Sequence, residues 1–279
     1  DYRSFIGDII IPEGKTLTIT GTVLLGANSR IRVHRGGKLH LDGGLLTDLC
    51  DQMWYGVEVW GSPNYGQNPV DQGWVLIENG GTIENSEQGV VASLLEEDPS
   101  DGELIPNPLY AGGIIQANDG IFRNNQTAIQ LYSYQTTTSG SWFVDCNFYI
   151  DDSYFGFNDP ENYMVISYMD GVDITYCSFT NETSTPQQFI GILGEHATFY
   201  VEGDCVSGNP CEDWENGIFE NLEYGIYATS ISSTRYADIR HTNFTENFRG
   251  VYLGGMTSPR VTSNKFYFNI PAAEQGYGL

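Results

Sequence analysis

The sequence predicts an all-β solenoid, a stack of similar short coils built from strands. Two observations favour this fold class. A short phrase recurs with one internal spacing, and its first apolar residues follow one another at intervals of 22 to 26 residues over much of the chain. Such a period suits one coil of a solenoid. A sustained leucine-rich phrase is missing and hairpin signals are weak, so leucine-rich repeats and antiparallel sandwiches are disfavoured.

The recurring phrase predicts two strands joined by a polar corner. An apolar residue is followed after one position by a polar one, and Gly or Ala stands six residues after the apolar residue, before a β-branched residue. Asn suits the bend because it tolerates left-handed backbone angles, and Gly permits a second tight turn. The phrase leaves no room for a helix. Its four matches start at Ile83, Phe122, Phe219 and Phe244.

The phenylalanines of the repeat predict a core ladder. Buried aromatic stacks usually serve packing, so these residues are interpreted as scaffold. The steps of 31 residues from Phe148 to Phe179 and of 40 from Phe179 to Phe219 indicate coils with loop insertions. The ladder is expected to contain Phe122, Phe148, Phe179, Phe219, Phe244 and Phe266.

These residues resemble the right-handed parallel β-helix repeats of the pectin-lyase-like superfamily, over roughly residues 75 to 270. The resemblance implies a single-stranded solenoid of roughly nine or ten coils. It also implies a stacked Asn ladder of Asn85, Asn124, Asn181 and Asn221. Asn247 and Asn269 stand one place later, where this ladder is expected to shift or break.

Residues 1–50 are expected to form N-terminal capping and opening coils, because their short strands alternate with Gly turns. They resemble the opening coils of secreted bacterial β-helix proteins, including surface proteins exported by type IX secretion. Residues 51–279 are expected to hold the β-helix repeats. Their insertions are expected near 62–74, 93–110, 133–141, 151–170 and 201–216. The end of the chain lacks a clear cap, so further domains of a parent protein are expected.

The charge excludes some partners. With 36 acidic and 12 basic residues the net charge is −24, which disfavours nucleic acid and anionic membranes. It is compatible with cations, with neutral sugars or with a solvated acidic surface. No apolar run is long enough to span a membrane, so no transmembrane segment is expected.

The five cysteines suggest an oxidising compartment. Cys205 and Cys211 flank a turn-rich loop and are predicted to form a disulfide. Cys146 and Cys177 each precede a ladder Phe by two residues, so they are expected to stack on adjacent coils. They would be either core thiols or a second disulfide. A composition rich in Tyr, Asn, Thr and Gly and poor in Lys predicts a secreted or cell-surface location.

The acidic aromatic insertion 151–170 is the best candidate site. Aromatic faces stack on sugar rings while carboxylates bond hydroxyls, and clustered carboxylates could hold Ca²⁺. The alternative is a solvated loop whose aromatics cover the side of the solenoid. The expected glycan-binding residues are Tyr154, Phe157, Tyr163 and Tyr168. The expected calcium ligands are Asp151, Asp152, Asp159 and Glu161.

Catalytic candidates are weaker. Glycosidases need two carboxylates at a set separation. Adjacent side chains of a strand point to opposite faces, so a partner for Asp151 or Asp152 is expected on the next coil, at Asp170 or Asp173. Glu195 and His196 supply another acid and a base. Lyases of this fold resemble one another in using a basic residue, and the supply of Lys and Arg here is thin.

Two functions are therefore predicted. The first is a non-catalytic extracellular module of a larger secreted or cell-surface protein, serving adhesion, display or glycan binding. It requires no cofactor, and its partners would be a polysaccharide or cell-surface glycan and other domains of the parent protein. The alternative is a carbohydrate-active enzyme, a polysaccharide lyase or glycoside hydrolase, although fold alone does not establish an activity.

Overall fold

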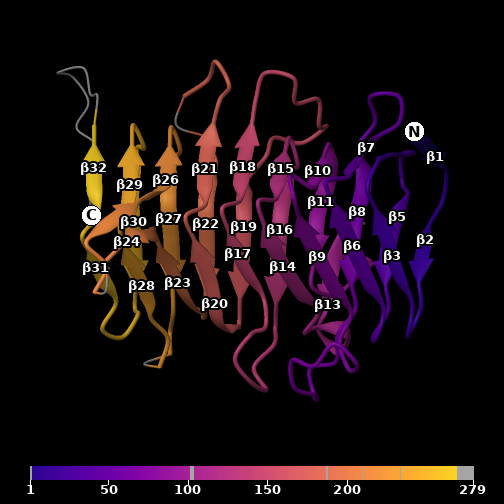
Figure 1. The fold of residues 1–279 in the computed structure, drawn as a ribbon, viewed down its shortest axis with the longest axis horizontal. Helices are drawn as coiled ribbons and strands as arrows, with labels where there is room; N and C mark the ends of the chain where they lie inside the picture. Colours follow the sequence, from indigo (N-terminus) through magenta and orange to yellow (C-terminus); the bar gives the residue numbers. More distant parts are fainter. Residues whose placement is uncertain (1, 101–103, 187, 209, 233, 269–279) are drawn as a thin grey trace.

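The computed structural model describes residues 2–100, 104–186, 188–208, 210–232 and 234–268. Three long parallel sheets, named A, B and C here, run the length of the molecule (Figure 1), which is a right-handed parallel β-helix. The predicted fold class is confirmed. The chain passes from A to B to C and then to the next strand of A. Nine complete coils are described, and β32 opens a tenth.

The strands have the following bounds. Sheet A contains β1 (Tyr2–Phe5), β4 (Thr22–Leu25), β7 (Leu45–Asp48), β10 (Thr82–Glu84), β15 (Ile121–Arg123), β18 (Asn147–Ile150), β21 (Ser178–Asn181), β26 (Gly217–Glu220), β29 (Thr242–Thr245) and β32 (Lys265–Tyr267). Sheet B contains β2 (Ile9–Ile11), β5 (Arg30–Val33), β8 (Trp54–Val59), β11 (Ser86–Val91), β16 (Thr127–Tyr132), β19 (Asn162–Ser167), β22 (Ile190–Glu195), β27 (Tyr224–Thr229) and β30 (Arg249–Gly254). Sheet C contains β3 (Thr16–Ile19), β6 (Lys38–Asp42), β9 (Trp74–Glu78), β14 (Ile114–Asn118), β17 (Trp142–Val144), β20 (Asp170–Thr175), β23 (Thr198–Glu202), β28 (Ala237–Arg240) and β31 (Arg260–Thr262).

The phenylalanine ladder runs along the inside of sheet A. Adjacent rings stack with centroids 4.6 to 5.1 Å apart and with 2 to 15° between their planes. In the register of the sheet Ile83 lies opposite Phe122, and Leu46 lies opposite Ile83. Each such buried side chain contributes about 1.5–3 kcal/mol relative to exposure. The predicted ladder is confirmed, and smaller apolar residues continue it toward the N-terminus.

Three corners after sheet A use the expected Asn, and further buried Asn side chains stand one residue after a corner. Asn85, Asn124 and Asn221 adopt left-handed φ of 58°, 52° and 60°. Asn181 instead belongs to β21. The corner amides of Asn85 and Asn221 donate to Asp48 and Asn181 of the preceding coil. A second set of amides, one residue after the corner, bonds the backbone of the preceding coil. Asn247 accepts from the backbone N–H of Leu222 and donates to the carbonyl of Phe219.

Asn125 makes the equivalent pair of bonds in an earlier coil. It accepts from the N–H of Ser86 and donates to the carbonyl of Ile83. The expected Asn ladder is therefore present in part, since Asn85, Asn181 and Asn221 bond neighbouring coils and Asn124 bonds Asp151 of the next coil. It is joined by a second set of amides one residue after the corner, at Asn125 and Asn247.

Insertions interrupt the coils at the strand ends. The loop between β8 and β9 covers 60–73, and the loop between β16 and β17 covers 133–141. A hairpin of β12 (Leu94–Glu97) and β13 (Leu104–Asn107), followed by the short helix η1 (Pro108–Tyr110), separates β11 from β14. The loop after β18 ends at 161, earlier than the expected 170, because the apolar residues from Tyr163 onward form β19. An insertion between β21 and β22, described over 182–186 and 188–189, was not predicted.

Four of the five cysteines form two pairs, one joined by a disulfide in a loop hairpin and one of free thiols in the core. Cys205 and Cys211 form the predicted disulfide, with Cα atoms 5.9 Å apart, in the hairpin of β24 (Asp204–Ser207) and β25 (Asp213–Glu215). Cys146 and Cys177 are free, buried thiols on adjacent coils. Burial raises the pKa of the Cys177 thiol well above its ordinary value. These two residues are stacked core thiols rather than a second disulfide.

Candidate ligand-binding groove

A groove of about 790 Å³ lies on the outer face of sheet B. Its floor is formed by β8, β11 and β16, whose inward residues Val57, Val90 and Ile129 are buried in the core. The β12–β13 hairpin contributes Glu97 and Leu104. The groove is lined by Tyr55, Glu87, Gln88, Glu97, Leu104, Gln126, Thr127, Phe157, Asn158, Asp159 and Glu161.

A bulge shapes the floor. The pairing of β11 with β8 shifts register between Gln88 and Val90. Gly56 has φ of 112°, and a Cβ there would lie 1.4 Å from the carbonyl oxygen of Gln88, so only glycine fits. Bulges re-aim side chains and are common beside functional sites. Here the bulged residues form part of the groove lining.

The loop 151–161 is anchored while its tip stays exposed. Tyr154 packs against the core, and its hydroxyl donates to the carbonyl of Asn158 at 2.6 Å. The N–H of Glu161 donates to the carbonyl of Gln126 on the floor. Phe157, between these anchors, is fully exposed. It also lines a second hollow of about 570 Å³, which shares Glu87 and Gln126 with the groove.

The lining is acidic. Glu87, Glu97, Asp159 and Glu161 contribute carboxylates, and Lys and Arg are absent from the lining among the described residues. Burial raises the pKa of Glu87, and the charge of Arg30 opposes this increase. Amides of Gln88, Gln126 and Asn158 add neutral donors and acceptors. The groove therefore presents aromatic faces together with hydrogen-bonding groups of negative or zero charge.

The sequence-predicted residues of the insertion separate into two groups. Phe157, Asp159 and Glu161 line the groove. Tyr163 is buried, and its hydroxyl donates to the carbonyl of Thr180, so it belongs to the core. Tyr154 positions the loop instead of lining the groove.

Asp151 and Asp152 fasten loops near the corner between sheets A and B. Burial alone would raise the pKa of Asp151, but hydrogen bonds from Ser153, Asn124 and Arg123 outweigh it and hold that pKa well below its ordinary value. Asp152 accepts a hydrogen bond from the N–H of Ser184 at 2.8 Å. Both carboxylates hold backbone and side chains in place.

The remaining catalytic candidates lie on other elements. Asp170 and Asp173 belong to β20 in sheet C, where Asp170 pairs with Arg235. Burial raises the pKa of Asp173. Asp151 and Asp152 follow β18, a strand of sheet A. Their expected partners, Asp170 and Asp173, therefore lie on a different sheet.

Glu195, His196 and Tyr168 meet at the corner between sheets B and C. Tyr168 and His196 both adopt left-handed φ on adjacent coils, and their ring centroids lie 4.8 Å apart. Nδ1 of His196 accepts from the N–H of Ile231, and Glu195 accepts from the hydroxyl of Ser167.

Sequence reasoning missed the floor of the groove. Glu87 and Gln126 each stand four residues after the apolar start of a repeated phrase, Ile83 and Phe122 respectively. The repeat therefore places them at equivalent positions on neighbouring coils. The repeat could therefore have indicated Glu87 and Gln126. It could not have indicated Glu97 and Leu104, because these two residues belong to a hairpin outside the repeat.

The expected calcium ligands do not gather into one site. In the described part of the chain, the three side chains close enough to share a metal ion are His40, Asp42 and Glu78 on sheet C. Of the expected set, Asp159 and Glu161 line the groove, while Asp151 and Asp152 make the loop contacts described above.

Comparison of the chain with models of known protein families gives no match, and neither does comparison with curated proteins. The structure supports a parallel β-helix, and no family match supports the pectin-lyase-like or the type IX resemblance. Among the described residues, no helix has the length and apolar character needed to cross a bilayer.

Proposed function

We propose that the protein is an extracellular glycan-binding module without catalytic activity, and that its ligand lies in the groove over β8, β11 and β16. The observation that carries this proposal is the fully exposed ring of Phe157 beside a floor of amides and carboxylates. An exposed ring beside hydrogen-bonding groups offers a ligand a flat apolar face together with polar partners. Sugar rings offer the flat C–H surface that stacks on such a ring.

The charge of the lining selects among sugars. A uronate chain would bring carboxylates toward Glu87, Glu97, Asp159 and Glu161, and like charges held at short range repel. Neutral oligosaccharides meet no such penalty, and their hydroxyls match the amide and carboxylate acceptors. The proposal therefore specifies a neutral oligosaccharide.

The disulfide supports the proposed location. A disulfide between Cys205 and Cys211 closes an exposed hairpin, and disulfides of this kind persist in oxidising compartments. A secreted or cell-surface module, with its neighbours in a longer protein, is the setting that we propose.

A glycan array tests the binding function. The chain is expected to retain neutral oligosaccharides and to reject uronate oligomers, and soluble ligand is expected to be recovered unchanged. Retention of uronates in preference to neutral sugars would contradict the groove as the binding site.

A glycoside hydrolase is the second candidate, favoured by the raised pKa of Glu87. A half-buried carboxyl with a raised pKa is better suited than an ordinary one to protonate a glycosidic oxygen, while Asp159 or Glu161 would act as the second carboxylate. Hydrolysis of neutral polysaccharides that is lost in Glu87→Gln and kept in Asp173→Asn would establish this function. Binding without products from any polysaccharide in the screen would exclude it.

A further inference from the structure

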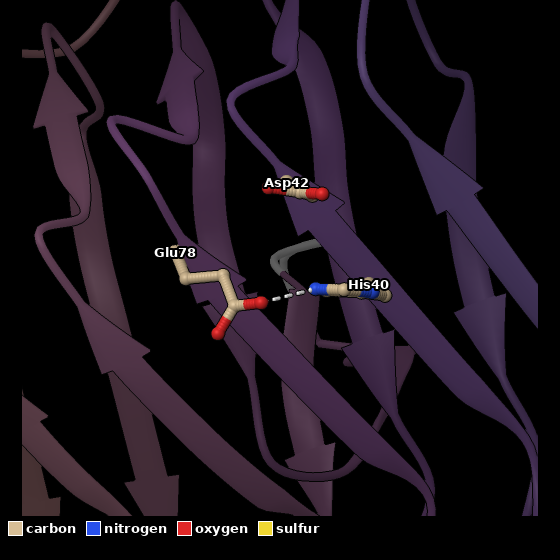
Figure 2. Close-up of side chains that lie close together, drawn as sticks. All are labelled: His40, Asp42 and Glu78. Atoms are coloured by element: carbon tan, nitrogen blue, oxygen red, sulfur yellow. Dashed lines mark hydrogen bonds and ion pairs between the residues drawn. The ribbon is translucent and has the colours of Figure 1, made fainter.

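A histidine and two carboxylates meet on the outer face of sheet C, away from the groove on sheet B. His40 and Asp42 alternate along β6 with the buried Leu39 and Leu41, so they face outward. Glu78 on β9 lies directly opposite Asp42 in the parallel register. Because neighbouring strands lie about 4.8 Å apart, the three side chains share one patch (Figure 2).

The donor atoms are close together. Nε2 of His40 lies 2.8 Å from Oε1 of Glu78, and one ligand atom from each of the three residues lies within 4.8 Å of the others. The side chains of His40 and Glu78 are 21% and 33% exposed, so the patch is open to solvent on one side. An ion could enter without any rearrangement of the sheet.

A neighbouring amide orients the third ligand. Nδ2 of Asn79 donates to Oδ1 of Asp42 at 2.7 Å. Asn79 has left-handed φ of 56° at the corner after β9, which brings its amide to the preceding coil. Hydrogen bonds of this type hold metal-binding carboxylates in position. The neighbouring cation of β6, Lys38, is held over the ring of Trp74 at 3.9 Å.

We infer that His40, Asp42 and Glu78 form a binding site for one divalent transition-metal ion, with Zn²⁺ as the best match. An imidazole nitrogen with carboxylate oxygens suits Zn²⁺. Three protein ligands leave a fourth tetrahedral position for water. Ligand distances of about 2.0–2.2 Å require the carboxylates to rotate toward the ion, which would replace the direct contact between His40 and Glu78. Ca²⁺ wants six to eight oxygens, so it is disfavoured.

The inference is independent of the glycan function and has its own test. Zn²⁺ is titrated into the untagged, chelator-treated chain by isothermal calorimetry, and bound metal is counted after dialysis. We compare the wild type with His40→Gln and Asp42→Asn. Glu202→Gln is the matched control, because it removes one negative charge from the same sheet at a carboxylate near Arg240. Circular dichroism checks that each variant is folded.

One Zn²⁺ per chain is expected in the wild type and in Glu202→Gln, with affinity at least about tenfold lower in His40→Gln and in Asp42→Asn. Ca²⁺ at the same concentration should give no comparable heat. The inference is overturned if the wild type retains no Zn²⁺. It is also overturned if His40→Gln binds Zn²⁺ as tightly as the wild type, since the ion would then lie elsewhere.

Discussion

The hydroxyl of Tyr154 donates a hydrogen bond to the carbonyl oxygen of Asn158 at 2.6 Å, and this bond closes the turn that carries Phe157. The ring of Tyr154 packs against the core below. An exposed loop is thereby tied to the solenoid on one side of its tip. The position of Phe157 in the groove depends on this internal bond as well as on the sheet beneath it.

Tyr154→Phe removes the hydroxyl and keeps the ring. The loss of one hydrogen bond is expected to lower the free energy of unfolding by about 0.5–1.5 kcal/mol. Glycan affinity should fall as well, because a looser loop must be ordered on binding. Urea unfolding and calorimetry measure the two effects. Tyr163→Phe is the control, since its hydroxyl bonds Thr180 in the core. Equal glycan affinity in both variants would contradict the role of the Tyr154 bond.

Phe219→Ala tests the ladder. The ring of Phe219 stacks between those of Phe179 and Phe244, so its removal leaves a cavity and should lower the free energy of unfolding by about 3–5 kcal/mol. Ile231→Ala, at an exposed position, should change that free energy by less than about 0.5 kcal/mol. Denaturant titration measures both. A loss below about 1 kcal/mol for Phe219→Ala would argue against the ladder as core.

Asn247→Ala tests the buried amides. The substitution leaves the N–H of Leu222 and the carbonyl of Phe219 without their side-chain partner, and each buried unsatisfied group costs about 1–3 kcal/mol. The free energy of unfolding should fall by at least about 2 kcal/mol. Substitution of the exposed Gln52 by Ala should leave it nearly unchanged. The same small change in both variants would show that Asn247 does not tie the coils.

Asp151 should make part of the stability depend on pH. Its pKa in the folded protein lies below the ordinary value, and the unfolded value is about 3.9. At pH values between these two pKa values, the unfolded chain therefore binds more protons than the folded protein. The contribution of Asp151 to the free energy of unfolding is present above pH of about 5 and declines as the pH falls. The stability difference between wild type and Asp151→Asn, measured by urea unfolding at each pH, should shrink below pH of about 4. A difference that does not change with pH would contradict the assigned bonds.

The repeat made the architecture predictable, because the recurring phenylalanines from Phe122 onward mark the residues that lie opposite one another on neighbouring strands. The expected Asn85, Asn181 and Asn221 bond neighbouring coils, whereas the bonds of Asn125 were not predicted. Asn124 and Asn125 are both buried, and the sequence pattern alone does not show which of the two bonds the preceding coil.

The site was predictable only in part. Phe157, Asp159 and Glu161 stood in an obvious interruption of the repeat. Tyr163 stood in the same interval, but β19 had already begun there, and every residue of that strand is buried. The approach of Glu97 to the groove depends on a hairpin that pairs only with itself, so no repeat could indicate it.

The most direct test of the proposed function is calorimetric titration of Phe157→Ala with a neutral oligosaccharide retained on the array. Because the ring is fully exposed, its removal should leave the free energy of unfolding unchanged. Tyr65→Ala, an exposed aromatic outside the groove, is the control. The account predicts a loss of at least about 2 kcal/mol in binding, roughly 30-fold in Kd, for Phe157→Ala alone. Unchanged affinity in Phe157→Ala would contradict the groove as the glycan-binding site.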